Sequence, residues 1–133
     1  LTRDEGEVWK AFRRAAFNVL ASNRDDHGKN HGFLYRERVW QLGPAYDLTF
    51  ASPDQLPERG LALLGERRAA GPRELLRLAV EESLDPRAAA DVIDEVRAVA
   101  RRWCKFASDA GVPTLQAAEI ENALRSTLST KSK

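Results

Sequence analysis

Three polar residues in the first half of the chain have a spacing that suits metal-dependent chemistry. Asp25 and Asn30 are separated by four residues, and Asp47 follows Asn30 by seventeen positions. A carboxylate can accept a proton from an attacking hydroxyl, and carboxylate and amide oxygens are hard ligands that suit Mg²⁺. Phosphoryl transfer from ATP to a hydroxyl needs both. Because each residue alone is more often a cap or a turn residue, only their joint arrangement favours this chemistry.

Asp25 and Asn30 belong to a polar loop, residues 23–32, that has no apolar side chain. Asn, Asp and Gly favour turns, and we expect Asp26 to serve a turn here. His27 and His31 are four residues apart, a spacing that could bind a metal on a helix. They lie in a loop with no third ligand nearby in the sequence, so we do not expect zinc.

A helix and a hairpin are predicted on either side of the polar loop. Thr2 and Glu5 fit a capping box for a helix over 4–22, with an apolar stripe facing a core and polar residues opposite. The polar side carries Lys10, Arg13, Arg14 and Asn18. Two short apolar runs within residues 33–42 predict a β-hairpin. Residues 44–49 then continue as an extended or turning segment.

The remainder of the chain is predicted to be a loop over residues 51–60 followed by helices within 61–128. Pro72 and Pro86 lie where the first residue of a helix is expected. We expect the helix that begins after Asp85 to run through Phe106 and close at Gly111, and a last helix to start at Thr114. Residues 130–133 are expected to fray. The expected core includes the following side chains: Trp9, Phe12, Trp40, Val96, Trp103, Phe106 and Leu124. Trp40 and Tyr46 are expected to pack the hairpin onto the helices.

Composition narrows the classes of protein. The chain has 133 residues, the size of one domain. Lys and Arg number 21 against 20 Asp and Glu, which argues against binding nucleic acid or a membrane surface by bulk charge. No apolar run is long enough to cross a membrane. The single cysteine, Cys104, is expected to be a small core residue in a reducing cytoplasm. The absence of Met leads us to expect that the sequence is part of a longer protein.

Two motifs, D-x-H-x-K-N over residues 25–30 and P-x-Y-D over residues 44–47, resemble those of HipA-type serine/threonine kinases, the toxins of bacterial HipA–HipB toxin–antitoxin pairs. The close match covers about residues 15–50. The resemblance implies a mainly α fold, in which a helical protein-kinase-like C-terminal lobe has a small β-hairpin beside the catalytic loop and the metal-binding aspartate. Residues 1–133 would form this lobe without the N-terminal lobe. Its parts would be a catalytic loop at 23–32, a hairpin at 33–42, a metal-binding segment at 44–49 and a helical subdomain at 61–128.

The resemblance also implies roles for individual residues. Asp25 matches the catalytic aspartate that accepts the proton of the substrate hydroxyl. Asn30 and Asp47 match the residues that bind Mg²⁺ and, through it, the phosphates of ATP. Lys29 would neutralise charge on the transferred phosphoryl group. His27 would be an internal hydrogen-bonding strut that orients the loop.

As a whole, the resemblance implies a cytoplasmic kinase that transfers the γ-phosphate of Mg-ATP to a Ser or Thr hydroxyl of a protein, as the toxin of a toxin–antitoxin module. A HipB-like DNA-binding antitoxin would be its partner, and it would contact neither nucleic acid nor a membrane itself. No glycine-rich loop or strand lysine can be placed before the first helix, so the fragment alone is expected to be inactive. Two alternatives stay open: a kinase-like phosphotransferase acting on a lipid or small molecule, and a catalytically dead helical module that binds an antitoxin-like partner.

Overall fold

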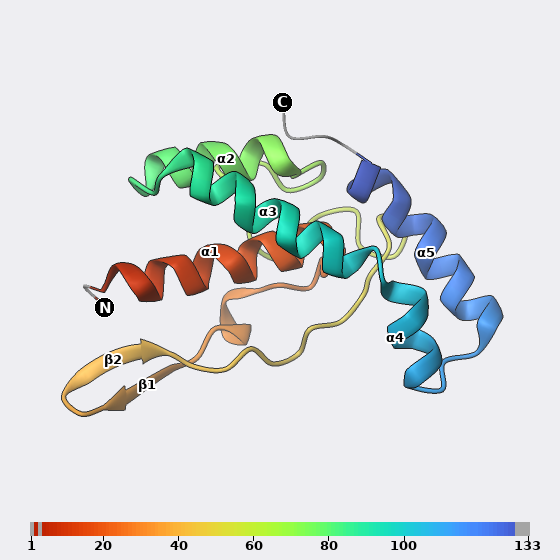
Figure 1. The fold of residues 1–133 in the computed structure, drawn as a ribbon, viewed down its shortest axis with the longest axis horizontal. Coiled ribbons are helices and arrows are strands. Elements are labelled where there is room, and N and C mark those ends of the chain that lie inside the picture. The colour runs from red at the N-terminus through yellow and green to blue at the C-terminus, as the bar shows by residue number, and fades with distance from the viewer. Residues whose placement is uncertain (1, 3, 130–133) are drawn as a thin grey trace.

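The computed structural model describes residue 2 and residues 4–129 and is mainly helical, as predicted, with one two-stranded antiparallel hairpin (Figure 1). In chain order the elements are α1 (Glu5–Leu20), the 3₁₀ turn η1 (Gly28–Asn30), β1 (Phe33–Arg36), β2 (Val39–Leu42), α2 (Pro72–Glu81), α3 (Pro86–Ala100), α4 (Trp103–Asp109) and α5 (Thr114–Ser129). The expectation for residues 130–133 lies outside the described residues. No helix within the described part of the chain is long and apolar enough to span a membrane.

The first helix begins and ends differently from the prediction. The backbone N–H of Gly6 donates to the Asp4 carboxylate at 2.7 Å, so Asp4 is the N-cap and the capping box predicted from Thr2 is wrong. A carboxylate caps a helix start well because it accepts an otherwise unpaired N–H there. The helix ends at Leu20, because Ser22 has a left-handed backbone with φ of 53° that an α-helix cannot continue through.

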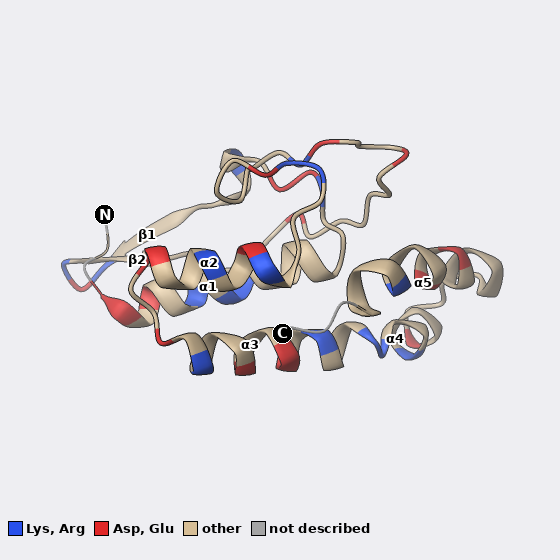
Figure 2. Ribbon diagram, turned by 90° about the horizontal axis from the view of Figure 1, so that it is seen from above, with Lys and Arg blue, Asp and Glu red and all other residues tan. Residues whose placement is uncertain are grey.

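The hydrophobic core lies between α1, α2 and α3. Leu20, Leu75 and Ile93, one from each helix, are the largest fully buried side chains. Seen at a right angle to Figure 1, α3 lies on one side of α1 and α2, and the irregular segment that follows the hairpin lies on the other (Figure 2). The core therefore fixes α1, and α1 in turn supports the polar loop at its C-terminal end.

The single long helix predicted after Asp85 is two helices. The chain breaks at Arg101 and Arg102 between α3 and α4, and α4 turns away to pack with α5. The indole N–H of Trp103 donates to the carbonyl of Ala117 in α5 at 2.9 Å, which helps to hold this turn. The break also changes which side chains are covered: Phe106 is 41% exposed and Cys104 is exposed, so both were wrongly predicted to lie in the core.

The other predicted core residues mostly fit. Phe12, Val96 and Leu124 are buried, and Trp9 and Trp103 pack partly buried against the core.

The hairpin has the predicted bounds but not the predicted packing. Its strands pair from Phe33 opposite Leu42 to Arg36 opposite Val39. Trp40 is 43% exposed and its ring contacts the ring of Tyr35 across the strands, at a centroid distance of 5.2 Å. The prediction that Trp40 packs the hairpin onto the helices is therefore wrong, because the strands project past the helical layer (Figure 1).

Charged side chains of α1 attach the base of the hairpin instead. The Leu42 N–H donates to the Glu7 carboxylate at 2.6 Å, and the Arg14 guanidinium donates to the Gly43 carbonyl, also at 2.6 Å. Glu7 and Arg14 are two helical turns apart and so lie on one face of α1. The hydrogen bond from Lys10, together with that from Leu42, lowers the pKa of Glu7. Burial lowers the pKa of Arg14. Leu42 and Gly43 are thus held by two side chains of α1. The sequence pattern placed Arg14 on the polar side of the helix and gave Glu7 no role.

This attachment predicts a pH-dependent stability. Because the pKa of Glu7 is lower in the folded chain than its ordinary value of 4.5, its stabilising effect is present above that value and is lost as the carboxylate is protonated. We expect the Glu7→Gln variant to melt below the unaltered chain at about pH 7 and the gap to shrink towards about pH 3. Glu37→Gln, at the exposed hairpin turn, is the matched control. A gap that stays constant with pH would contradict the role of the Glu7 charge.

Candidate functional site

The structure brings together the Asp25 backbone carbonyl, the Asn30 side chain and the Asp47 carboxylate. Asn30 is buried, and its amide nitrogen donates to the backbone carbonyl of Asp25 at 3.1 Å and to the carboxylate of Asp47 at 3.2 Å. One amide therefore joins two segments that are seventeen residues apart in sequence. Since the amide nitrogen is engaged, the amide oxygen of Asn30 is directed elsewhere, and it has no hydrogen-bond partner within the described residues.

The polar loop is a compact turn stabilised by its own backbone. The His27 N–H donates to the Asp25 carbonyl, and the Asn30 N–H donates to the His27 carbonyl, each at 2.9 Å. The turn leaves the side chains of Asp25 and Lys29 exposed. The His27 ring is half-buried, and its Nδ1 has no hydrogen-bond partner in the described part of the chain. His27 therefore contributes to the turn through its backbone, and a strut role for its ring stays a prediction.

Asp47 lies in an exposed segment with an unusual backbone. Its φ is 53°, a left-handed value that non-glycine residues adopt infrequently and Asp tolerates better than most. The preceding residue, Tyr46, is 47% exposed, so the prediction that it packs the hairpin onto the helices is wrong. Its hydroxyl instead donates to the backbone carbonyl of Lys29 at 2.5 Å. The two segments of the site are thus joined twice, at Lys29 with Tyr46 and at Asn30 with Asp47.

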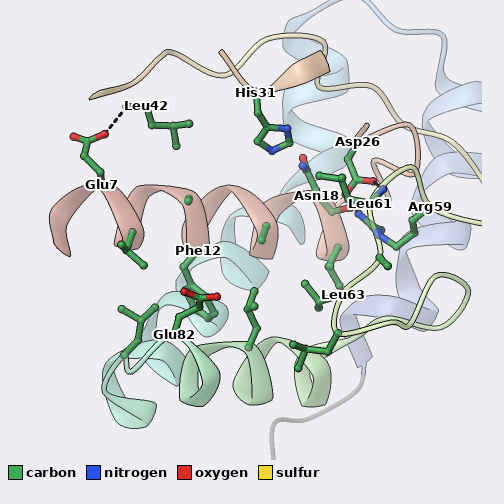
Figure 3. Close-up of a pocket in the computed structure, with 18 of the residues that line it drawn as sticks. Glu7, Phe12, Asn18, Asp26, His31, Leu42, Arg59, Leu61, Leu63 and Glu82 are labelled. Atoms are coloured by element: carbon green, nitrogen blue, oxygen red, sulfur yellow. Dashed lines mark hydrogen bonds and ion pairs between the residues drawn. The ribbon is translucent and has the colours of Figure 1, made fainter. Parts of the chain in front are cut away.

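Asp26 has the opposite environment from Asp25. It is buried and forms an ion pair with Arg59, which is also buried (Figure 3). The second carboxylate oxygen of Asp26 accepts the Leu61 N–H at 3.3 Å. Sequence reasoning expected only a turn role for Asp26 and did not single out Arg59. No local signal links two residues that are 33 positions apart.

The irregular segment after the hairpin is held against the inner side of the polar loop by arginines. Arg59 also donates to the backbone carbonyls of Asn18, at 3.4 Å, and Asn23, at 3.0 Å. Arg24 donates to three further carbonyls, of Leu56, Pro57 and Arg68.

Gly60 allows the closest approach of this segment to the loop. A Cβ added at Gly60 would lie 2.7 Å from the backbone nitrogen of His27, so only glycine fits there without a shift.

A cavity of about 430 Å³ lies behind this part of the site, between α1, the base of the hairpin and residues 61–64 (Figure 3). Its wall is mostly apolar, with the Asp26 and Arg59 pair and the His31 ring at one end. Asp25, Asn30 and Asp47 do not line it. The oxygens that could do chemistry therefore lie on the outer side of the loop, away from this cavity.

The side-chain oxygens of Asn30 and Asp47 are of the kind that a hard divalent cation prefers, but they are few. The free amide oxygen of Asn30 and the exposed carboxylate of Asp47 could provide two oxygen ligands. Mg²⁺ commonly keeps several waters and takes substrate phosphates as further ligands. The described residues contain no group of three or more His, Cys, Asp and Glu side chains that could bind a metal. The arrangement therefore fits a Mg²⁺ ion that phosphates help to hold, and two protein ligands would bind the bare ion weakly.

Comparisons with known proteins concern the family and the fold of the chain. Residues 2–103 match the family described as the HipA-like C-terminal domain. Over 63 residues the chain is 36% identical to "Putative kinase Y4mE" of Sinorhizobium fredii (strain NBRC 101917 / NGR234), which covers 46% of this chain and 15% of that protein. The fold is similar, with a TM-score of 0.72, to a chain of the Shewanella oneidensis MR-1 toxin–antitoxin complex of HipA, HipB and operator DNA. That match covers 90% of this chain and 30% of the other at 18% identity, so it shows the fold alone.

The buried ion pair gives a test of what holds the loop. Replacing Asp26 with Ala leaves the Arg59 guanidinium buried without its carboxylate, which costs on the order of 3–5 kcal/mol in other buried pairs. We expect a loss of this size in the free energy of unfolding, measured by urea denaturation. Glu95→Ala, which removes the exposed ion pair with Arg13, is the control and should cost less than about 1 kcal/mol. Equal losses for the two variants would rule out a special role for the buried pair.

Proposed function

The chain belongs to the family of HipA-like C-terminal domains, and we propose that it is the part of a serine/threonine protein kinase that supplies the proton acceptor and the Mg²⁺ ligands. Family membership confirms the resemblance inferred from the two sequence motifs. The single observation that carries the proposal is the position of Asn30, whose amide bonds both the Asp25 backbone and the Asp47 carboxylate. Phosphoryl transfer needs a base and metal ligands in one site, and its catalysis is mostly positioning and charge stabilisation.

Each residue then has a role that its environment allows. The exposed Asp25 carboxylate would accept the proton of the attacking hydroxyl. The oxygens of Asn30 and Asp47 would hold Mg²⁺ against the phosphates of ATP. The exposed Lys29 ammonium would lie beside the transferred phosphoryl group and offset its charge. Protein hydroxyls are the proposed acceptors, because the two motifs resemble those of serine/threonine kinases. The name of the curated relative specifies a kinase and no acceptor.

The proposal concerns a whole protein of which these residues form a part. The chain spans 15% of the curated relative and 30% of the solved chain that it matches. Kinases hold the nucleotide with a glycine-rich loop and a strand lysine, and this sequence offers no segment for either. We therefore propose that the nucleotide-binding groups come from outside these residues and that the 133-residue chain alone transfers no phosphate.

The proposed setting is a bacterial toxin–antitoxin pair. The structural relative is part of a complex of HipA with HipB and operator DNA. We propose a HipB-like DNA-binding protein as the partner of the whole protein, which itself would not contact DNA. A small helix-turn-helix gene directly upstream of its gene would support this setting, and a conserved metabolic gene in that place would weaken it.

The role of Asp25 can be tested in the full-length protein. We expect Asp25→Ala to lower the rate of autophosphorylation or of ATP hydrolysis by about 10²–10⁴-fold, the usual contribution of a positioned base. The side chain is exposed, so thermal stability should change little. Asp54→Ala, another exposed aspartate in the irregular segment, is the control and should keep the full rate. Near-normal turnover of Asp25→Ala would exclude it as the base.

The role of Asp47 is a matter of binding rather than proton transfer. In the full-length protein we expect Asp47→Ala to weaken Mg-ATP binding at least about tenfold, because even outer-shell partners of metal ligands commonly contribute that much. Calorimetric titration with ATP in the presence of Mg²⁺ measures the effect, and the same titration with EDTA should show little difference between the two proteins. Unchanged affinity for Mg-ATP would argue against Asp47 as a ligand.

A further inference from the structure

We propose that Tyr46 is a positioning residue, whose hydroxyl holds the Asp47 carboxylate in place for the metal. The inference rests on the proposed function, because it assigns a task to Tyr46 only if Asn30 and Asp47 bind a divalent cation. Tyr46 itself would touch neither the metal nor the substrate.

The first support is how few hydrogen bonds hold this segment, in which Phe50 also packs against the core. Among the described residues, positions 44–50 make two hydrogen bonds to the rest of the chain: that of Tyr46 with the Lys29 carbonyl and that of Asp47 with the Asn30 amide. The neighbouring attachments lie outside this stretch, at Gly43 and Ala51. Without the Tyr46 hydroxyl, the only hydrogen bond from residues 44–50 to the rest of the described chain would be the one between the buried Asn30 amide and the exposed Asp47 carboxylate.

The second support is the pattern of the two bonds. Lys29 and Asn30 are consecutive, and so are Tyr46 and Asp47, so the bonds join two adjacent residues of one segment to two adjacent residues of the other. A single bond allows the segments to rotate about it, whereas two adjacent bonds fix their relative orientation. The proposed Mg²⁺ ligands are one member of each pair, so the distance between their oxygens depends on this orientation.

The third support is the backbone of Asp47. Its left-handed φ of 53° is one that non-glycine residues adopt infrequently, although Asp tolerates it better than most. The Tyr46 side chain is anchored one residue before this point, and the Asp47 carboxylate is anchored at it. The bond from Tyr46 therefore limits relaxation of the backbone that would carry the carboxylate away from Asn30.

Tyr46→Phe removes the hydroxyl and keeps the ring, which lies beside Gly32. Tyr35→Phe is the matched control, because Tyr35 is 59% exposed in the same hairpin region and its ring contacts only Trp40 among the described aromatic rings. Both variants lose one phenolic oxygen, but only Tyr46 uses it to join the two site segments.

The test uses Mn²⁺ in place of Mg²⁺ and the isotope-labelled full-length protein with a non-hydrolysable ATP analogue, whose phosphates help to hold the ion. Paramagnetic broadening of the Asn30 and Asp47 amide signals is followed against Mn²⁺ concentration, alongside thermal melts. For Tyr46→Phe we expect the midpoint of broadening to rise about three- to tenfold, the range that loss of one neutral hydrogen bond supports. The melting temperature should stay close to that of the unaltered protein, and Tyr35→Phe should match it in both measurements.

The outcomes separate this inference from the proposed function. Broadening with the same midpoint in Tyr46→Phe and in the unaltered protein would overturn the positioning role and leave the metal site standing. A raised midpoint accompanied by an equal rise in Tyr35→Phe would also overturn it, since the effect would then be general. No broadening at Asn30 or Asp47 in the unaltered protein would overturn the metal assignment itself, and the inference with it.

Discussion

The polar loop and the irregular segment after the hairpin depend on the buried ion pair between Asp26 and Arg59. Almost thirty residues between β2 and α2 contain no helix or strand, and their backbone polar groups need partners wherever they are buried. Arg59 supplies such partners where the irregular segment meets α1 and the polar loop. Its guanidinium bonds the Asp26 carboxylate, a carbonyl near the end of α1 and a carbonyl at the start of the polar loop. Burying both charges has a desolvation cost, which the additional hydrogen bonds offset. These polar contacts thus fix the irregular segment to the core helix, in addition to the packing of Phe50, Leu63 and Ala70 against the core.

Charged side chains also attach the base of the hairpin to α1. Glu7 and Arg14 bind backbone groups of Leu42 and Gly43, so charged side chains of the helix hold the base of the hairpin where apolar side chains do not. The loop and the hairpin are therefore bonded to α1 and the irregular segment, whereas Asp25 and Asp47 stay exposed. Openness suits the proposed chemistry, because Mg²⁺ with two protein ligands must leave room for water and phosphates. A closed site with more carboxylates would hold the bare ion tightly and leave no position for the nucleotide.

Local signals made part of the fold predictable. The bounds of the hairpin and the starts of α2, α3 and α5 follow from turn residues and prolines that act within a few positions. The break before Trp103 and the exposure of Trp40 and Phe106 could not be predicted, because they depend on what packs against each element in three dimensions. For the site, the motif spacing indicated that Asp25, Asn30 and Asp47 belong together. The hydrogen bonds of Arg59 and Arg14 to distant backbone carbonyls could not be predicted, because an arginine on an amphipathic helix or in a loop is usually solvated.

Asp25 and Asp26 show how structure decides the role of a residue type. The two are adjacent and chemically identical, yet one side chain is exposed and the other is buried. Both oxygens of Asp26 are engaged, one by Arg59 and one by the Leu61 N–H. Asp26 can therefore neither take a proton from a substrate nor bind a metal without breaking one of these interactions. That engagement helps to fix the backbone of the loop, in which the Asp25 carbonyl accepts from the Asn30 amide and the Asp25 side chain is exposed. The backbone that carries the proposed proton acceptor is therefore held by the buried carboxylate next to it in the sequence.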